Sequence, residues 1–488
     1  MSSIKELSKD TIIYGLGTVI KKIIGFLLLP FYTRALIPAE YGVLDTLATL
    51  TFFISAIFSL GLGGATSRYF FIAVDEDEKK KLLYTSATIR LISYSIPLIF
   101  MTIFSEKISF ILFKTESYSL VIIAVAFVIF FSSQQEIQSQ IFRFYREPVK
   151  FSFVTILGSI INPFCGILLV VILKWGVLGA TIASLITSVS TLSFAYLYFT
   201  RKKYIRQFSW NWAKKLLKFG YPLIFTGMLV WVNDVSDRFF LLHYKNLAQI
   251  GLYSIGNTFS QPILLVNIAL NMSATVIIFS LYNEEKEEDK PRTKAFLTKI
   301  WYFYLTIAIS ASSFISIFSY DIVKFVTSPK YIGGILAIPF LLFSLILNQC
   351  VSITGNGMTL KEKSKPYFWL MLLAAGVNVL LNFYFIPNFG YVGAAITTII
   401  SNMVYFILAY VWSQKVFYIK RSFMRPALYF IVCLMVAVFF PFYELKGNMH
   451  VSILIKAPIF LTLLAFPLIL RIIDYKLALN LLNIYKNK

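Results

Sequence analysis

Apolar runs long enough to cross a lipid bilayer recur along almost the whole sequence, and this recurrence constrains the fold most. A helix rises about 1.5 Å per residue, so roughly 20 apolar residues cross the ~30 Å hydrocarbon core of a bilayer. Hydrophobic residues make up 58% of the 488 positions and charged residues only 14%. Because backbone groups in lipid must find hydrogen-bond partners within the chain, these runs predict an all-α integral membrane protein.

Fourteen apolar runs are predicted to be transmembrane helices. In chain order they are residues 11–36, 41–66, 82–104, 117–142, 149–173, 176–199, 214–242, 249–281, 294–319, 331–354, 366–386, 391–412, 426–444 and 451–473. Lys and Arg concentrate in every second loop, which predicts that both termini are cytoplasmic. This distribution explains most of the net charge of +22 through membrane orientation, so no nucleic-acid partner is expected.

Two pairs of segments indicate an internal repeat. KWGVLGATIASLITS at 174–188 matches NFGYVGAAITTIISN at 388–402, and PAEYGVLDTLATL at 38–50 matches LAQIGLYSIGNTF at 247–259 more weakly. Six predicted spans separate the copies, so both copies have the same membrane orientation. Parallel repeats of this kind predict two lobes with a substrate site between them. We therefore predict a six-helix N-lobe at 1–208, a six-helix C-lobe at 209–423, and two additional helices with a cytoplasmic tail at 424–488.

The first apolar run carries two lysines, Lys21 and Lys22, near its centre. A lysine at the middle of a bilayer costs about 2.5–3.5 kcal/mol on insertion scales, so it must face a wet cavity or a counter-charge. Gly17 and Gly25 lie one helical turn before and after Lys21, which predicts open space beside the lysine. Pro30 predicts a bend. We interpret the run as a cavity-lining helix that presents cations to an anionic ligand; the alternative is a lysine pair neutralised by carboxylates for packing.

The N-terminal LSKDTIIYGLGTVIKKIIGFLLLPFYTRALIPAEYGVLDTLATL, the two six-span lobes and the two extra C-terminal spans resemble the polysaccharide and O-antigen (Wzx-like) flippases of the multidrug/oligosaccharidyl-lipid/polysaccharide exporter superfamily. This resemblance implies a transporter of the cytoplasmic (inner) membrane that moves polyprenyl-diphosphate-linked oligosaccharides outward by alternating access. It also implies the lipid bilayer and other polysaccharide assembly proteins as partners. A peptidoglycan lipid-precursor flippase and a cation-coupled multidrug exporter of the same fold are the alternatives, followed by a membrane glycosyltransferase or polymerase.

Arg90 is predicted to join Lys21 and Lys22 in binding the anionic head group of the substrate. It lies well inside the third predicted span, too deep for an ordinary loop charge. Arginine suits bidentate contact with phosphate oxygens, whereas lysine acts as a point charge. The alternative for Arg90 is that its side chain extends to the inner membrane interface.

Further ionisable residues within spans are candidates for ion coupling or gating. Asp234 and Arg238 are four residues apart and are predicted to form an ion pair. Asp237 would then be a ligand of a coupling ion or would lie near the outer interface. Glu136 lies in a glutamine-rich run that lines a polar vestibule or ends a helix. Coupling to sodium, protons or the membrane potential would drive transport.

No pattern in the sequence indicates catalysis, a cofactor or a metal site. A Walker A sequence is missing, and His243 and His450 are isolated from other metal-binding residue types. Cys165, Cys350 and Cys433 lie far apart in apolar stretches, so they are expected to fill the core rather than form disulfides. We therefore predict that the protein is not an enzyme.

Overall fold

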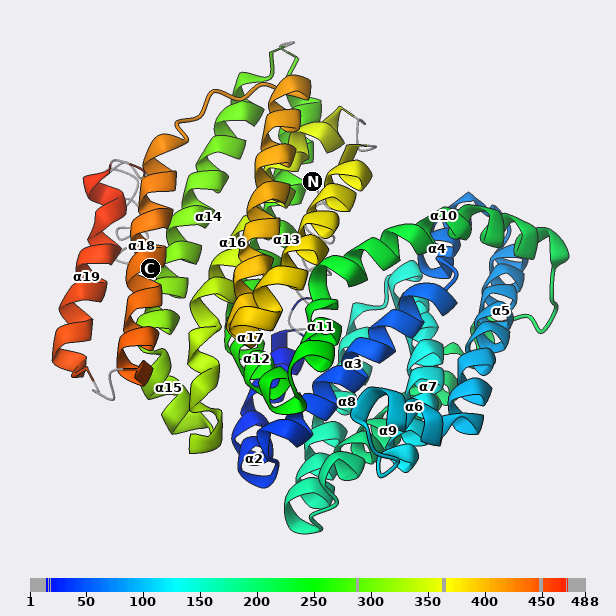
Figure 1. Cartoon of the computed structure of the whole chain (residues 1–488). Coiled ribbons are helices and arrows are strands. Elements are labelled where there is room, and N and C mark those ends of the chain that lie inside the picture. Colours follow the sequence, from blue (N-terminus) through cyan, green and yellow to red (C-terminus); the bar gives the residue numbers. More distant parts are fainter. Residues whose placement is uncertain are drawn as a thin grey trace. The chain divides into compact units, whose positions relative to one another are not determined.

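The computed structural model describes residues 15, 17, 19–286, 289–361, 366–446, 451–470 and 472, and these are folded into helices and connecting segments without β-strands (Figure 1). The predicted all-α class is confirmed. Internal contacts divide the chain into a first unit, Met1–Gly251, and a second unit, Leu252–Lys488. This division falls later in the chain than the predicted lobe boundary at 208/209, and the predicted domain boundaries stay predictions.

The first unit begins with an N-terminal helix, helical over its described residues 19–27. The elements that follow are α2 (Leu29–Ala35), α3 (Pro38–Phe58), α4 (Leu62–Ile72), α5 (Glu76–Ile103), α6 (Ser105–Phe113), α7 (Ser119–Phe144), α8 (Pro148–Gly166), the π-helical η1 (Ile167–Ile172), α9 (Gly176–Phe194), the π-helical η2 (Ala195–Thr200), the 3₁₀ turn η3 (Arg201–Lys203), α10 (Trp210–Val235) and α11 (Asp237–Tyr244). Helix α12 (Leu247–Ser260) crosses the boundary between the units.

The second unit contains longer helices on average. Its elements are α13 (Pro262–Glu284), α14 (Pro291–Ile317), α15 (Ser319–Val326), the 3₁₀ segment η4 (Pro329–Leu336), α16 (Ile338–Leu360), α17 (Pro366–Val416), α18 (Met424–Lys446) and α19 (Ile453–Ile469). Many helices in both units begin with proline in the first turn, where its missing N–H leaves no hydrogen bond unmade. These include α3, α8, α13, α14 and α16.

Ten helices among the described residues are long and apolar enough to cross a membrane. The predicted spans at 366–386 and 391–412 both lie in α17, on either side of a kink at Gly390. The φ of 58° and ψ of −137° at Gly390 are not helical, so α17 consists of two helical segments, as predicted. The predicted span at 249–281 is divided at Gln261 between α12 and α13, and α19 is a shorter apolar helix of 17 residues. The N-terminal part of the first predicted span lies outside the described residues.

The structure interrupts the first helix close to Pro30, and the bend predicted there stays a prediction. The N-terminal helix is interrupted at Leu28, and α2 begins at Leu29 with Pro30 in its first turn. Because proline has no backbone N–H, the helix lacks one of its hydrogen bonds at Pro30, which weakens it at this point.

The glycines of the stronger repeat match share a positive φ angle. Gly176 and Gly390, which the sequence match equates, have φ angles of +56° and +58°, a region that favours glycine. Gly42 and Gly251, the glycines of the weaker match, make reciprocal close contacts. A Cβ atom on Gly42 would lie 1.9 Å from the Leu247 carbonyl oxygen, and one on Gly251 would lie 2.0 Å from the carbonyl oxygen of Pro38. Any side chain at either glycine would separate α3 from α12.

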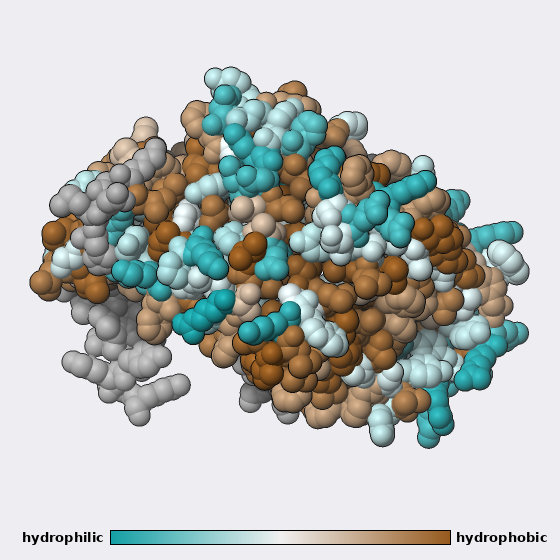
Figure 2. All heavy atoms as spheres, turned by 60° about the horizontal axis from the view of Figure 1, so that its bottom comes forward, coloured by the Kyte–Doolittle hydropathy of each residue, from teal (hydrophilic) through white to brown (hydrophobic). Residues whose placement is uncertain are grey.

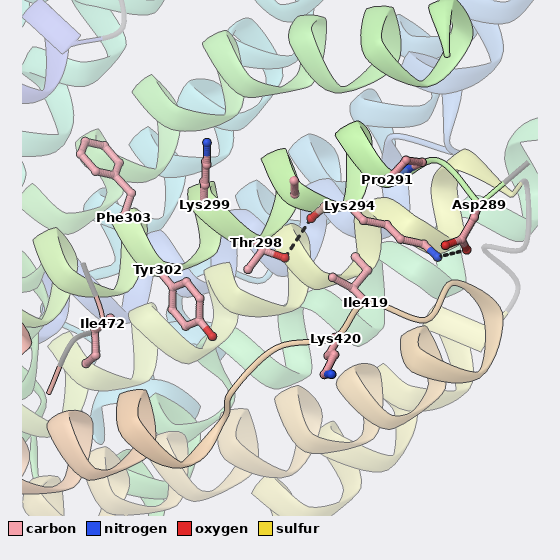
Figure 3. Close-up of a pocket in the computed structure, with 11 residues that line it drawn as sticks. Asp289, Pro291, Lys294, Thr298, Lys299, Tyr302, Phe303, Ile419, Lys420 and Ile472 are labelled. Atoms are coloured by element: carbon pink, nitrogen blue, oxygen red, sulfur yellow. Dashed lines mark hydrogen bonds and ion pairs between the residues drawn. The ribbon is translucent and has the colours of Figure 1, made fainter. Parts of the chain in front are cut away.

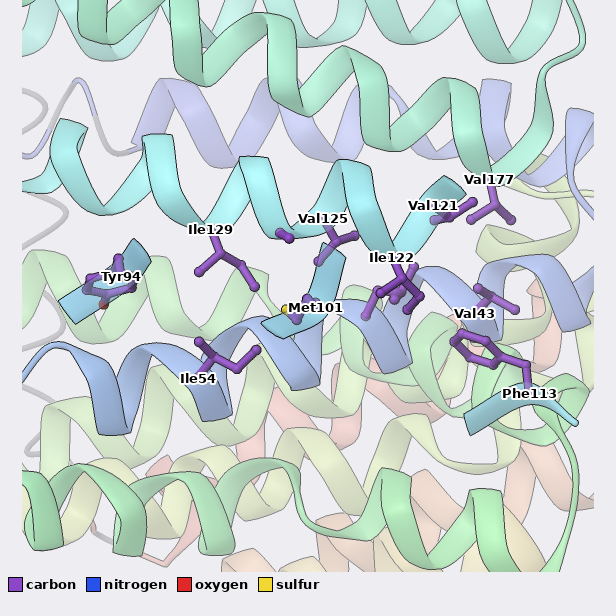
Figure 4. Packing of buried hydrophobic residues seen from close by; sticks show 12 residues of the cluster. Val43, Ile54, Tyr94, Met101, Phe113, Val121, Ile122, Val125, Ile129 and Val177 are labelled. Atoms are coloured by element: carbon purple, nitrogen blue, oxygen red, sulfur yellow. The ribbon is translucent and has the colours of Figure 1, made fainter. Parts of the chain in front are cut away.

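Apolar side chains fill the interior of the first unit and also cover its surface. Figure 4 shows one buried cluster, in which Val43 and Ile54 of α3 pack against Tyr94 and Met101 of α5 and against Ile129 of α7. Close packing of this kind holds helices together in lipid, where the hydrophobic effect between helices is lost.

Large apolar side chains also stand exposed, among them Phe71, Phe164 and Leu380, which are 70–71% accessible. On the face shown in Figure 2, hydrophobic residues cover broad areas and hydrophilic residues gather in patches. Such apolar exposure is expected of a surface that contacts lipid rather than water.

Candidate functional site

A polar cavity of about 570 Å³ lies within the first unit, between the N-terminal helix and helices α7, α8 and α9. Its polar lining consists of Lys21, Ser132, Gln135, Ser139, Arg143, Thr155, Ser159, Asn162, Ser184, Thr187 and Ser188. Two of these side chains are cations, and none of the residues that line the cavity is a carboxylate. The site therefore combines positive charge with hydroxyl and amide groups.

Helix α7 supplies a full polar stripe to this cavity. Ser132, Gln135, Ser139 and Arg143 follow one another at spacings of three and four residues, so they lie on one face of the helix. This face places an arginine at one end of the cavity and amide and hydroxyl groups along its wall.

Three hydroxyl groups of the cavity donate hydrogen bonds to backbone carbonyl oxygens of their own helices, and their oxygens can still accept hydrogen bonds from a ligand. Thr155, Ser159 and Thr187 each donate to the carbonyl oxygen four residues earlier, over 2.7–2.8 Å. A hydroxyl oxygen that donates once retains its lone pairs, which can accept hydrogen bonds from sugar hydroxyls. Asn162 of α8 donates to Ser184 of α9 over 3.4 Å and joins the two walls.

Lys21 lies where the sequence predicted it, on the wall of a polar cavity. A Cβ atom on Gly25 would have no heavy atom within 4 Å, which confirms the predicted open space on that side. On the other side, a Cβ atom on Gly17 would lie 3.2 Å from the Ser152 hydroxyl oxygen, so Gly17 permits close packing against α8 instead. Within the described part of the chain, Lys21 and Arg143 have no ion-pair partner.

A second cavity of about 380 Å³ adjoins the first. The two cavities share Val128, Asn162 and Ser184 as lining residues, and the second one extends to Tyr32 of α2 and Thr51 of α3. The polar surface of the first unit therefore continues from Lys21 toward α3.

Arg90 lies outside the lining of the Lys21 cavity, and so does Lys22. The Arg90 side chain is 1% exposed, and its Nη1 atom donates to Glu136 Oε2 over 2.7 Å and to the carbonyl oxygen of Ser133 over 3.2 Å. Glu136 and Ser133 lie on the face of α7 that is next to the polar stripe. The structure thus pairs two of the predicted site residues, Arg90 and Glu136, and leaves Arg90 charge-compensated.

Arg238 pairs with other carboxylates than the sequence predicted. Its Nη1 atom donates to Asp237 Oδ1 over 2.8 Å, and its Nε atom donates to Asp45 Oδ2 over 3.2 Å. Arg238 Nη1 also donates to the backbone carbonyl oxygen of Asp234 over 2.9 Å. The Asp234 carboxylate itself accepts a hydrogen bond from the Asn233 side chain. The regular helix is interrupted at Ser236, between α10 and α11. The spacing of four residues therefore does not bring the side chains of Asp234 and Arg238 together. Asp45 comes from α3, which no local pattern could place beside Arg238.

Two groups of ionisable residues were missed by the sequence analysis. Arg143 stands at the end of α7, whereas the predicted spans 117–142 and 149–173 place it in the loop between them. In the second unit, the fully buried Lys456 of α19 pairs with Glu444 of α18 at 2.8 Å and with Asp321 of α15 at 2.5 Å. The sequence signal for Lys456 was a lone lysine inside an apolar run, as at Lys21.

Among the described residues, no group of three or more His, Cys, Asp or Glu side chains is arranged to bind a metal ion. The three cysteines are free.

Buried asparagines of the second unit serve interhelical packing: Asn378 donates to Ser401 over 3.2 Å, and Asn402 donates to Ser344 over 2.6 Å. Hydrogen bonds of this kind stabilise helix association in membranes.

Comparison with known proteins identifies the family. A family model described as "Polysaccharide biosynthesis protein" matches residues 7–280, more than half of the chain. An uncharacterized membrane protein of Haemophilus influenzae is 23% identical over 279 residues, a match that covers 56% of this chain and 65% of that relative. The chain thus spans slightly less than two thirds of that relative's length.

Solved structures share the fold. The lipid II flippase MurJ in an inward closed conformation superposes with a TM-score of 0.74 and 18% identity, covering 96% of this chain and all of that one. An inward-facing multidrug resistance MATE family transporter of the MOP superfamily superposes with a TM-score of 0.65 and 20% identity, covering 84% and 95%. The chain therefore shares its fold with these solved structures and belongs to the polysaccharide biosynthesis protein family.

Proposed function

We propose that this protein is a flippase that moves polyprenyl-diphosphate-linked oligosaccharides, such as polysaccharide or O-antigen repeat units, across the cytoplasmic membrane by alternating access. One observation carries the proposal: the cavity of the first unit holds Lys21 and Arg143 and no carboxylate among its lining residues. Family membership supports it, since the family is one of polysaccharide biosynthesis proteins. Both termini would lie in the cytoplasm.

The cavity suits both parts of such a head group. A phosphate oxygen about 4 Å from a cation gains roughly 4 kcal/mol at an effective dielectric constant near 20, before desolvation is counted. Arg143 can form two parallel hydrogen bonds to a phosphate, and Lys21 acts as a mobile point charge. The serine, threonine and asparagine groups around them match the hydroxyls of a sugar.

The remaining predicted site residues take supporting roles in this proposal. Lys22 adds positive potential next to Lys21. The pair formed by Arg90 and Glu136 would open and close as the first unit changes conformation, and in the open state Arg90 would join the binding of the diphosphate. Asp234, Asp237 and Arg238 would couple the change to sodium or proton binding.

The membrane potential also favours outward movement of an anionic head group. Moving one charge through 100 mV is worth about 2.3 kcal/mol, so an inside-negative potential drives a doubly charged diphosphate outward. Coupling to cation entry would add to this force.

Two alternatives share the fold. A peptidoglycan lipid-precursor flippase would carry the same diphosphate, and the similarity to the lipid II flippase MurJ, which concerns the fold alone, is compatible with it. A multidrug exporter for cationic drugs would place carboxylates in its cavity, and the lining of this cavity favours an anionic substrate instead.

The test is leaflet exposure in proteoliposomes. Purified protein is reconstituted with a fluorescent polyprenyl-diphosphate oligosaccharide, with fluorescent lipid II or with a cationic dye, each with and without an inside-negative potential. We expect protein-dependent exposure of the oligosaccharide lipid that the potential accelerates. Exposure of lipid II alone would support the peptidoglycan alternative, and efflux of the dye alone would contradict the anionic-substrate proposal.

A further inference from the structure

The second unit contains a cavity of about 680 Å³ beside the first turns of α14, which we call the α14 pocket (Figure 3). Its lining residues are Asp289, Pro291, Lys294, Ala295, Thr298, Lys299, Tyr302, Phe303, Ile419, Lys420 and Ile472. Helix α14 forms one wall, and the segment between α17 and α18 brings Ile419 and Lys420 to the other. The proposed transport function makes no use of this pocket.

The segment that carries Lys420 is held firmly against α14. The Tyr302 hydroxyl donates to the Ser422 carbonyl oxygen over 3.1 Å and accepts from the Ser422 N–H over 2.9 Å. The guanidinium of Arg421 lies 5.5 Å from the centre of the Trp301 ring. These contacts fix the position of Lys420 at the pocket instead of leaving it on a loose loop.

The pocket carries an excess of positive charge. Lys294 is paired with Asp289 over 2.5 Å, as the dashed line in Figure 3 shows. Lys299 and Lys420 are exposed and form no ion pair with any residue that the structure describes. Among the described residues, two lysines without an ion-pair partner therefore share one cavity.

Arg421 adds a third positive charge behind the pocket wall. Its Nε and Nη2 atoms are buried and find no hydrogen-bond partner among the described residues. Burial lowers the pKa of Arg421 to about 10, so the side chain is still protonated at pH 7. An anion in the pocket would lower the electrostatic cost of this buried charge.

The position and the apolar wall of the pocket indicate what kind of anion it takes. Helices α14 and α18 are candidate membrane spans that begin at Pro291 and Met424, so the pocket lies at the ends of two spans, where lipid head groups are found. Ala295, Phe303 and Ile419 give it an apolar wall beside the lysines. Basic pockets between transmembrane helices are a known means of binding anionic lipid head groups.

We infer that the α14 pocket binds an anionic glycerophospholipid of the surrounding leaflet, with Lys299 and Lys420 contacting its phosphate and the apolar wall contacting its upper acyl chains. A lipid bound in this way joins α14 to the segment between α17 and α18. The inference does not depend on what the protein transports.

Native mass spectrometry of the full-length protein in detergent tests this inference. Phosphatidylglycerol and phosphatidylcholine with identical acyl chains are titrated against wild type and against the double variant Lys299→Gln/Lys420→Gln. A lysine near an anionic lipid surface contributes about fivefold in affinity, so we expect phosphatidylglycerol binding to weaken roughly 30-fold in the double variant. Phosphatidylcholine binding is expected to stay weak in both proteins.

The matched control is Lys361→Gln/Lys415→Gln, which removes two exposed lysines of the second unit that do not line the pocket. It has the same net charge as the pocket variant and should bind phosphatidylglycerol like wild type. Equal weakening in both variants would overturn the inference, as would equal binding of the two lipids. Displacement of phosphatidylglycerol by equimolar inorganic phosphate would assign the pocket to free anions. Selective loss of polyprenyl diphosphate binding would assign the pocket to the transported lipid; either result contradicts the inference.

Discussion

At the scale of single residues, Lys21 and Arg143 are the cations on which the proposed function depends. The double variant Lys21→Gln/Arg143→Gln keeps polar side chains in the cavity and removes both charges. Hydrogen bonds to charged groups are worth about 1.5–3 kcal/mol each, so we expect the rate of head-group exposure to fall at least tenfold per charge. The measurement is the initial rate in proteoliposomes with matched protein content.

The control for that experiment is Lys107→Gln/Lys114→Gln. These two lysines of the first unit are exposed and lie outside the cavity lining, so the control has the same net charge and should transport like wild type. Equal loss in both double variants would point to net charge rather than to the cavity.

The two members of the Arg90–Glu136 ion pair differ strongly in their exposure to solvent, and this difference leads to a second prediction. Arg90 is 1% exposed and the Glu136 side chain is 51% exposed. Glu136→Ala leaves a buried guanidinium without its carboxylate partner, so we expect a clear loss of stability. Arg90→Met leaves a carboxylate that water can reach, so its cost should be smaller. Thermal unfolding in detergent checks the order, and a larger loss of stability in Arg90→Met would contradict the described pairing.

Sequence reasoning located part of this site and missed part of it. Lys21 was found because a charge at the centre of an apolar run is costly, and Gly25 marked the open side of its helix. Arg143 was missed because a cation at a helix end is ordinary, and only the packing of α7 against α8 and α9 turns it toward a cavity. The partner of Arg238 was predicted wrongly because Asp45 is distant in the chain.

At the scale of secondary-structure elements, Gly25 allows the N-terminal helix to border an open cavity. Gly25→Leu meets no atom in the way and replaces glycine with a better helix former, which favours the helix by up to about 1 kcal/mol. We expect unchanged or higher stability together with transport at least tenfold slower, because the new side chain occupies the cavity. Flipping rate and melting temperature are measured on the same preparation.

Gly376 of α17 offers a matched control, since a Cβ atom there also has no heavy atom within 4 Å and the residue lies outside the cavity of the first unit. Gly376→Leu should gain the same helix propensity and transport normally. Unimpaired transport by Gly25→Leu would show that the substrate does not pass beside the N-terminal helix.

The turn between α7 and α8 is tied to η3 by Glu147, which forms ion pairs with Lys150 at 2.8 Å and with Lys203 of η3 at 2.6 Å. Burial opposes ionisation of this carboxyl, but the hydrogen bonds from the two lysines outweigh it and lower the pKa of Glu147. A lowered folded-state pKa means that the stabilisation is present above the unfolded value of about 4.3 and is lost as the pH falls through the folded value.

Glu147→Gln should therefore melt below wild type at pH 7, and the difference should shrink as the pH falls below the ordinary pKa of glutamate. Melting curves between pH 3 and pH 8 test this expectation. A gap between the two proteins that stays constant over the whole range would mean that Glu147 ionisation does not contribute to stability.

Helix positions followed from hydropathy because each run of about 20 apolar residues has to cross the bilayer. Helix interruptions were harder to predict. The interruption next to Pro30 and the kink of α17 at Gly390 both lie where the sequence predicted a break, whereas the division at Gln261 did not follow from the local sequence. Gly390 carried a signal of its own, because its positive φ angle favours glycine and the residue belongs to a repeat detected in the sequence.

At the scale of the whole molecule, the sequence repeat, the family and the fold agree. The matched glycines Gly176 and Gly390 both have positive φ angles, and the fold superposes on that of a solved MATE transporter over most of the chain. The class of the protein could be read from hydropathy and the repeat, because both are properties of the whole chain. The substrate could not, because it depends on which side chains meet in three dimensions.

The most direct test of the proposed function is to find where the substrate head group binds. A polyprenyl-diphosphate oligosaccharide with a photoreactive group on its first sugar is crosslinked to the purified protein, and the adducts are mapped by mass spectrometry. We predict adducts on the cavity walls of the first unit, between Ser132 and Ser188, that disappear in Lys21→Gln/Arg143→Gln. Adducts confined to other parts of the chain, or unchanged by that variant, would contradict binding in this cavity.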